Sequence, residues 1–257
     1  DTEQGLKLFR IYNGSPKHLQ WEMMAKACLR ERGYVYIDQF VANQEGSFLT
    51  PDEDGQNYVL TDWYEGRECS TRDREEILRA VVHMAALHKG LHDITRSGEI
   101  DEVFSQGNLL DEMGRRRREL KTIRNYICRK KQKNAFDRRF MEFYQEFDEA
   151  GAGAQEILSE AGYMELYGQN CGEQRMCHGD YTQHNILMTQ GEIALVRFDH
   201  MHMELQIYDL YVFMRKILEK NHYSCCRSFC CNCHRIFPFH RRSPLLWRRL
   251  CRGFRFC

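Results

Sequence analysis

The stretch CHGDYTQHNIL, residues 177–187, contains the residue types that transfer of a phosphoryl group requires. Such a transfer needs a carboxylate beside the attacking hydroxyl and a metal ion on the phosphates, and little covalent help from the protein. Asp180 and Asn185 have the spacing at which a loop presents an Asp to the acceptor and then returns with a metal-binding Asn. We expect His178 to brace this loop and Gly179 to allow its tight path. A polar turn, in which Asp180 and Asn185 bond only nearby backbone groups, is the alternative.

Two short strands are predicted directly after this loop, in the segment ILMTQGEIALVRFD. Gln190 and Gly191 supply the turn between them, because apolar residues suited to strands lie on both sides. A hairpin of this kind returns the chain to the loop and delivers one more side chain there.

The chain before the loop changes character near residue 66. Residues 5–12, 34–41 and 58–66 alternate as strands do, and a helix that begins with a capping serine occupies residues 15–33. From residue 73 the apolar residues follow a helical period, and helical stretches continue to about residue 167. This order predicts an α+β protein with two lobes, an N-lobe in residues 1–65 and a helical C-lobe in residues 66–223.

The predicted helix that begins at residue 73 places Ile77, Leu78 and Met84 on one side. Two basic runs follow, at residues 115–118 and 129–133. We interpret them as solvated helix faces, with anion binding as the alternative.

Charge and hydropathy exclude several classes of protein. Residues 224–257 contain eight arginines and no acidic residue, which leaves 29 basic against 37 acidic side chains in residues 1–223. An acidic body does not favour nucleic-acid binding. No apolar run is long enough to span a bilayer, and the charged residues 1–20 do not resemble a signal peptide.

The loop resembles that of the aminoglycoside/choline phosphotransferase-like kinases, together with YVLTDWYEGREC and AALHKG before it. Through DLYVFMRKILEK, the chain more closely resembles the CotS family of spore coat proteins from endospore-forming bacteria. The resemblance covers roughly residues 5–223 and implies a two-lobed protein-kinase-like fold, with a small β-rich N-lobe and a larger helical C-lobe. It further implies ATP and Mg²⁺ as cofactors, other spore coat proteins as partners, and a place in the spore coat after synthesis in the mother-cell cytoplasm.

The same resemblance assigns nucleotide-binding roles in the N-lobe. Lys7 matches the strand lysine that holds the α- and β-phosphates, and Glu22 on the following helix would orient it. Asp62, Trp63 and Tyr64 match the hinge, whose backbone would meet an adenine ring. The alternatives are surface charges for Lys7 and Glu22, and core aromatic residues for Trp63 and Tyr64. Because the phosphate-covering loop of these kinases precedes the strand lysine, we expect the N-lobe to be incomplete at its start.

In the C-lobe, the resemblance makes Asp180 the catalytic Asp, with His178 beside it, and Asn185 a metal ligand. Asp209 matches the Asp that begins the next helix and ties back to the loop, although an N-cap role would also explain it.

The chain departs from the family where a second metal ligand is expected. An Asp normally begins the strand end that here reads VRFD, so Arg197 takes its place. A guanidinium cannot bind Mg²⁺ but can pair with phosphate directly. Asp199 lies on the same side of an extended strand and is the candidate for a displaced ligand, or else a structural partner of Arg197.

The tail formed by residues 224–257 is a second departure, because it contains seven of the twelve cysteines. Either Cys230, Cys233 and His234, with Cys225 or Cys226, form a zinc site, or this segment is an out-of-frame end. Three functions therefore remain open. They are a kinase-fold spore coat protein with a role in assembly and weak or absent phosphotransfer, an active ATP- and Mg²⁺-dependent small-molecule O-kinase, and a metal-binding tail protein.

Overall fold

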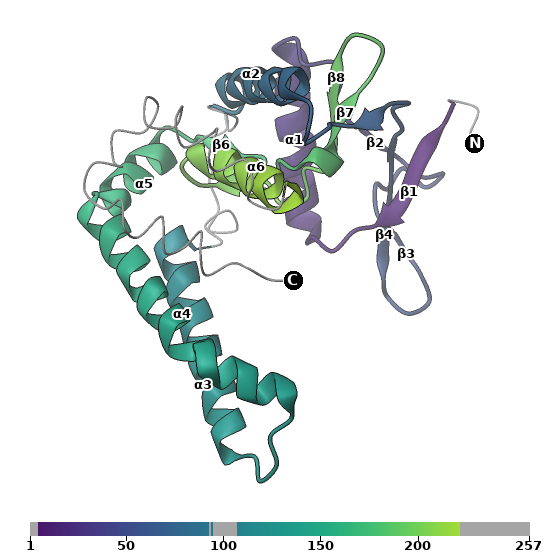
Figure 1. Cartoon of the computed structure of the whole chain (residues 1–257). Helices are drawn as coiled ribbons and strands as arrows, with labels where there is room; N and C mark the ends of the chain where they lie inside the picture. The colour runs from purple at the N-terminus through teal and green to yellow at the C-terminus, as the bar shows by residue number, and fades with distance from the viewer. Residues whose placement is uncertain (1–4, 93, 95–106, 222–257) are drawn as a thin grey trace.

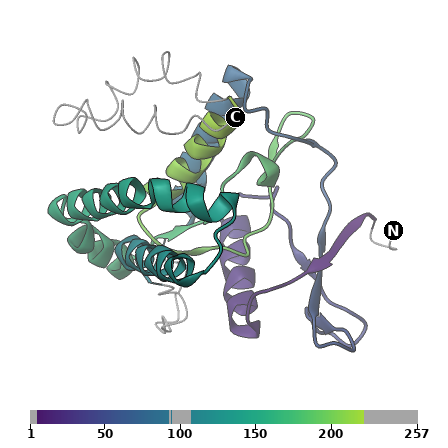
Figure 2. The ribbon, with the colours of Figure 1, turned by 60° about the horizontal axis from the view of Figure 1, so that its bottom comes forward.

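A small strand-rich part at the N-terminus precedes a larger helical part, which confirms the predicted α+β class (Figure 1). The computed structural model describes residues 5–92, 94 and 107–221. In both ribbon views α1 (Pro16–Glu31) lies between the N-terminal sheet and the other helices (Figures 1 and 2). The cysteine-rich tail, including the candidate zinc ligands, lies outside the described residues.

The N-terminal sheet is antiparallel and has β4 (Asn57–Asp62) at its centre. β1 (Lys7–Ile11) pairs with one edge of β4, β2 (Phe40–Val41) pairs with the other edge, and β3 (Thr50–Pro51) also pairs with β4. The register sets Lys7 opposite Asp62. Each residue of β1 therefore has a defined face, which decides the ion pairs it can make.

The two faces of β1 have different surroundings. Tyr12, directly after the strand, packs with Leu19 of α1 and Val59 of β4 in a small buried cluster. Phe9 points to the other face, is 60% exposed, and stacks on Tyr58 with ring centroids 4.9 Å apart. The face that carries Leu8, Arg10 and Tyr12 is therefore the one that meets α1.

The prediction of a strand over residues 34–41 is correct only at its end, where β2 begins at Phe40. The preceding residues cross to the helical part instead. Ile37 forms a parallel bridge with Leu195, and the amide of Leu195 donates to the carbonyl oxygen of Tyr36 at 2.9 Å. This segment therefore joins the N-terminal sheet to a C-terminal strand, a long-range pairing that local alternation cannot reveal.

α1 has the predicted ends. The Ser15 side chain accepts a hydrogen bond from the amide of His18, and Pro16 occupies the first helical position. Beyond the last turn, Gly33 has a φ of +91°, which suits the end of a helix.

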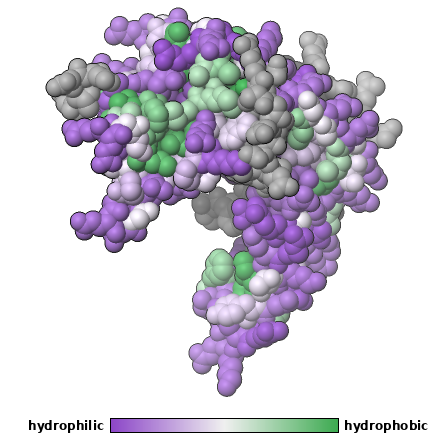
Figure 3. Space-filling view, turned by 180° about the vertical axis from the view of Figure 1, so that it is seen from behind, coloured by the Kyte–Doolittle hydropathy of each residue, from purple (hydrophilic) through white to green (hydrophobic). Residues whose placement is uncertain are grey.

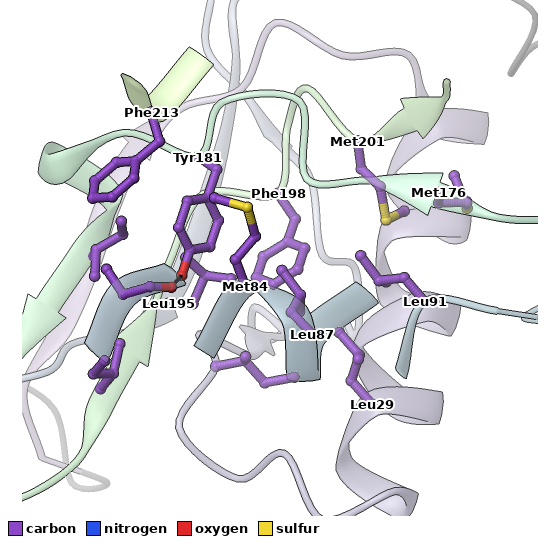
Figure 4. Close-up of a cluster of buried hydrophobic side chains, with 14 of the residues drawn as sticks. Leu29, Met84, Leu87, Leu91, Met176, Tyr181, Leu195, Phe198, Met201 and Phe213 are labelled. Atoms are coloured by element: carbon purple, nitrogen blue, oxygen red, sulfur yellow. Dashed lines mark hydrogen bonds between the residues drawn. The ribbon is translucent and has the colours of Figure 1, made fainter. Parts of the chain in front are cut away.

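The helical part has one main hydrophobic core (Figure 4). α2 (Arg74–Gly90) contributes Met84 and Leu87, and α6 (Ile207–Lys220) contributes Phe213. On α2, the predicted buried face is wrong for Leu78, which is 54% exposed because it lies beside the buried stripe. Tyr181 and Phe198 enter the same core from the segments near the candidate site, so the core fixes those segments in place.

Short strands connect the candidate loop to the rest of the helical part. β6 (Met176–Cys177) pairs with β9 (His202–Met203), and the 3-10 turn η2 (Gln183–Asn185) follows the loop. β7 (Ile186–Met188) and β8 (Ile193–Leu195) form the predicted hairpin. β5 (Arg67–Glu68) also pairs with β7.

α3 (Leu109–Arg129) and α4 (Ala135–Glu160) form an antiparallel hairpin that projects from the body, followed by α5 (Tyr163–Gly172) (Figure 1). The face of it seen in Figure 3 is mostly hydrophilic with a small apolar patch, and Tyr126 and Phe136 are 64% and 69% exposed. Arg117 Nε lies 3.0 Å from Asp148 Oδ1 on the other helix, and Arg116 pairs with Glu119 at 3.0 Å. These contacts favour the solvated-face interpretation of the first basic run. No described helix has the length and apolarity that a bilayer span would need.

Candidate functional site

The loop after β6 makes a turn that only glycine accommodates. Gly179 has a φ of +81°, a region that residues with a side chain seldom adopt. A Cβ atom placed on it would lie 1.9 Å from the carbonyl oxygen of His200. The predicted tight path is therefore present, and it results from the close approach of the strand that begins after His200.

Asp209 anchors this loop. Its buried carboxylate accepts hydrogen bonds from the amides of His178 at 2.8 Å and Gly179 at 2.9 Å, and it lies 2.9 Å from Nε2 of His88. Asp209 is in the first turn of α6, whose N-cap is Gln206. The predicted tie back to the loop is thus confirmed, and the N-cap alternative is wrong.

His178 makes the bracing contacts predicted for it. Its ring accepts from the amide of Asp180 at Nδ1, 3.3 Å away, so Nε2 carries the proton and donates to the carbonyl oxygen of Val196 at 3.2 Å. Burial lowers the pKa of His178 below its usual value, which favours the neutral ring. A neutral, fully engaged imidazole positions the loop and has no free nitrogen for proton transfer.

Asp180 and Asn185 meet at the end of the loop. Asn185 Nδ2 donates to Asp180 Oδ2 and to the Asp180 carbonyl oxygen, both at 2.8 Å. Both partners are acceptors, so the amide nitrogen must face them and the amide oxygen points elsewhere. Asn185 is buried whereas Asp180 is partly exposed. The carboxylate is therefore held in place and accessible, and the catalytic and metal-binding roles of the two residues stay predictions.

Arg197 follows β8 beside this loop. The amide of Val196 donates to the Asn185 carbonyl oxygen at 3.1 Å, and the buried ring of Phe198 lies 4.6 Å from the His178 ring. Between them, Arg197 has a φ of +64°, and its amide contacts Asp38 Oδ2 at 3.4 Å. Its side chain is 53% exposed. The backbone is thus fixed next to the candidate loop while the guanidinium remains accessible.

Asp199 is engaged by Arg10, a residue for which the sequence suggested no functional role. Two guanidinium nitrogens of Arg10 lie 2.6 Å from the two carboxylate oxygens of Asp199, and both side chains are largely buried. Arg197 is farther away, with Nη2 4.0 Å from Asp199 Oδ2. The sequence did contain one signal for Arg10. It is a charged residue on the face of the first strand that otherwise carries apolar side chains.

The predicted pairing of Lys7 with Glu22 is wrong. Lys7 Nζ lies 2.7 Å from Asp62 Oδ1, its cross-strand neighbour. Glu22, on α1, lies against the opposite face of β1, where its carboxylate accepts a hydrogen bond from the Tyr12 hydroxyl at 3.3 Å. Because strand residues alternate between faces, Lys7 and Glu22 cannot meet while α1 packs on the Tyr12 side. A nucleotide-binding role for Lys7 itself stays a prediction.

Glu22 instead takes part in a buried charge network around Lys26 of α1. Lys26 Nζ lies 2.8 Å from Glu22 Oε1 and 2.9 Å from Asp38 Oδ1, and the Phe40 ring centroid is 4.2 Å away. Although burial opposes the charge of Lys26, the two carboxylates outweigh it and raise the pKa of Lys26. Burial raises the pKa of Glu22, although the neighbouring Lys26 cation opposes this shift. The spacing of Glu22 and Lys26 on one helix face could have suggested this pair.

The hinge candidates are held by contacts within the protein. Asp62 pairs with Lys7 and also accepts from the amide of Gln39 at 3.1 Å. The Tyr64 hydroxyl donates to the Ile37 carbonyl oxygen at 3.0 Å. Trp63 is 51% exposed, so the core alternative is wrong for it. Contact of this segment with an adenine ring stays a prediction.

The residues present do not fit the Mg²⁺ site that the resemblance implies. Arg197 occupies the position of one ligand, and both oxygens of Asp199 face Arg10. The amide oxygen of Asn185 is not used in the contact with Asp180, so Asn185 alone still suits a metal ion. Within the part of the chain that the structure describes, no three His, Cys, Asp or Glu side chains are grouped so as to hold a metal ion. The ion pair with Arg10 opposes the prediction that Asp199 is a displaced ligand.

Solved structures share this fold at low sequence identity. An aminoglycoside phosphotransferase from Alicyclobacillus acidocaldarius is 17% identical with a TM-score of 0.67, over 88% of this chain and 66% of that one. Spectinomycin phosphotransferase APH(9)-Ia, solved with AMP, is 12% identical with a TM-score of 0.54, over 84% and 69%. Amicoumacin kinase hAmiN, solved with AMP-PNP, Ca²⁺ and Ami, is 16% identical with a TM-score of 0.50, over 84% and 59%.

The chain therefore spans about two thirds of the length of the first of these structures. A search of curated proteins found no match. The model of the phosphotransferase enzyme family, APH, matches residues 6–222. That match covers the sheet, the candidate loop and α6, and the kinase-like fold agrees with it. The chain belongs to the APH phosphotransferase enzyme family.

Proposed function

We propose that this chain is a kinase-fold protein of the bacterial spore coat, whose role is assembly with other coat proteins and whose phosphotransfer is weak or absent. The coat assignment rests on the resemblance of the segment DLYVFMRKILEK, which forms most of α6, to the CotS family. The relatives solved with AMP and AMP-PNP support a retained nucleotide site. Fold alone does not decide between an enzyme and an assembly protein, so the proposal depends on the site.

The observation that carries weak or absent phosphotransfer is the pair of changes at the metal position. Transfer from ATP depends on metal ions that neutralise the developing charge on the phosphates. Arg197 cannot supply a metal ligand, and Arg10 neutralises Asp199 through two contacts of 2.6 Å. Asp180 and Asn185 can position an acceptor hydroxyl. Without a metal ion on the phosphates, that positioning contributes little to the rate of phosphoryl transfer.

We expect phosphoryl transfer by the full chain to be no faster than by its Asp180→Asn variant. Positioning by a catalytic carboxylate accelerates proton transfer about 10²- to 10⁴-fold in working enzymes, so its removal would be conspicuous in an active kinase. The measurement is ATP consumption and product formation with a panel of small hydroxyl and amino compounds, with Mg²⁺ present. A wild-type rate at least tenfold above that of the variant would contradict the proposal.

Assembly into the coat is tested separately in a sporulating cell. A fluorescent fusion of the full chain is expected to move from the mother-cell cytoplasm to the outline of the spore. The Asp180→Asn fusion should do the same, because assembly does not require the carboxylate. Fluorescence that stays diffuse in the mother cell until lysis would count against the coat role.

The second candidate function is an active small-molecule O-kinase that uses ATP and Mg²⁺. It is favoured by the contact between Asp180 and Asn185 and by the presence of Lys7 on β1. Turnover that requires Asp180 would select this candidate over the assembly role. The third candidate, a metal-binding tail protein, depends on residues 224–257, which lie outside the described ranges.

A further inference from the structure

The side chain of Arg197 is the starting point, because it is a cation beside a loop typical of phosphate chemistry. Its backbone is fixed on both sides, by Val196 against Asn185 and by Phe198 against His178. Its guanidinium has one carboxylate within 4.0 Å among the described residues, Asp199, and that contact is at the limit. A guanidinium so placed keeps most of its hydrogen-bonding capacity for a ligand.

The charge of Asp199 does not cancel that of Arg197. Arg10 already forms a two-pronged pair with Asp199, at 2.6 Å for each contact, and this geometry is the stronger one. Among the described residues, Asp199 is thus matched by Arg10 rather than by Arg197, although Asp180 in the loop and Asp38 add negative charge nearby.

From this arrangement we propose that Arg197 binds the phosphate chain of a nucleotide directly, so that nucleotide binding here needs no divalent metal ion. The inference rests on the proposed function, which retains a nucleotide site. Guanidinium groups match phosphate oxygens with paired hydrogen bonds, and these are the strong class of such bonds. A Mg²⁺ ion would neutralise part of the phosphate charge and so weaken the attraction to Arg197. Metal therefore leaves binding unchanged or weakens it, whereas in a metal-bridged site it strengthens binding.

The test uses the full chain and isothermal titration calorimetry with two probes, AMP-PNP and inorganic tripolyphosphate. Each probe is titrated in excess EDTA and in excess Mg²⁺. We expect AMP-PNP to bind in EDTA at least as tightly as in Mg²⁺. Tripolyphosphate should bind more weakly with the same preference, because it has the phosphates but not the base.

Arg197→Asp should weaken AMP-PNP binding in EDTA about tenfold or more, the loss expected for a charged hydrogen-bonding partner. Aspartate tolerates the left-handed backbone found at this position, so the variant should fold, and its melting temperature without ligand checks this. Arg139→Asp on α4 is the matched control, since Arg139 is exposed and pairs with Glu142 far along the hairpin. It should leave binding unchanged.

The possible failures are distinct. Wild-type binding that requires Mg²⁺ overturns the inference and leaves the proposed assembly role intact. Binding in EDTA that Arg197→Asp does not weaken overturns the role of Arg197. Absence of binding by both probes in both conditions overturns the inference together with the retained nucleotide site. Rapid turnover of ATP, measured as above, overturns the proposed function whichever result the titrations give.

Discussion

Replacing Gly179 with alanine is expected to destabilise the protein by about 3 kcal/mol or more, one of the largest effects of any single substitution here. The new Cβ atom would lie 1.9 Å from the His200 carbonyl oxygen, so the backbone of the loop or of the following segment must move. That movement also disturbs the hydrogen bonds that Asp209 accepts from His178 and Gly179. The free energy of unfolding in urea measures the effect.

Gly46→Ala is the matched control for this experiment. Gly46 has the same φ of +81°, but no atom lies within 4 Å of the position of its added Cβ. Its replacement therefore reports the backbone cost alone, about 1 kcal/mol. Equal losses in the two variants would show that the close approach to His200 contributes nothing to stability.

Replacing Lys26 with methionine is expected to destabilise the fold by about 3–5 kcal/mol, because it leaves two buried carboxylates without their cation. Lys26 is fully buried between Glu22 and Asp38, and methionine fills a similar volume without the charge. Lys89→Met, at an exposed position in the last turn of α2, is the control and should change stability by less than about 0.5 kcal/mol.

The loss in Lys26→Met should depend on pH. Burial already raises the pKa of Glu22, and removal of the cation raises it further. A carboxyl whose pKa is raised by folding binds more protons in the folded state, so its stabilising contribution is lost as pH rises through the folded pKa. Urea unfolding should therefore show a smaller loss at about pH 5 than at about pH 8. A second substitution, Glu22→Gln, should recover part of the loss at the higher pH. A constant loss across this range would argue against unpaired carboxylates as its cause.

The parts of the site that are close in sequence could be predicted. The contact between Asp180 and Asn185, the turn at Gly179 and the tie to Asp209 all follow from one loop and the helix after it. The spacing of these residues limits where their side chains can lie once the loop forms. The hairpin of β7 and β8 was predictable for the same reason, since its turn lies between two short apolar runs.

The contacts that cross between distant segments could not be predicted. Whether Lys7 or Arg10 faces the helical part depends on which side of β1 receives α1, and both sides carry a cation. The pairing of Ile37 with Leu195 likewise joins segments with no local signal for each other. Such choices are decided by packing of the whole core, which single-sequence patterns do not encode.

The projecting hairpin of α3 and α4 has a consequence for how the molecule opens. Within the described residues of these two helices only Ile127 and Asp137 are buried, so the hairpin has no hydrophobic core of its own there. The two helices are joined in part by surface ion pairs such as Arg117 with Asp148. Surface pairs of this kind contribute little free energy. The hairpin can therefore unfold locally while α2 and α6 remain intact, and its amide protons should exchange with solvent long before theirs.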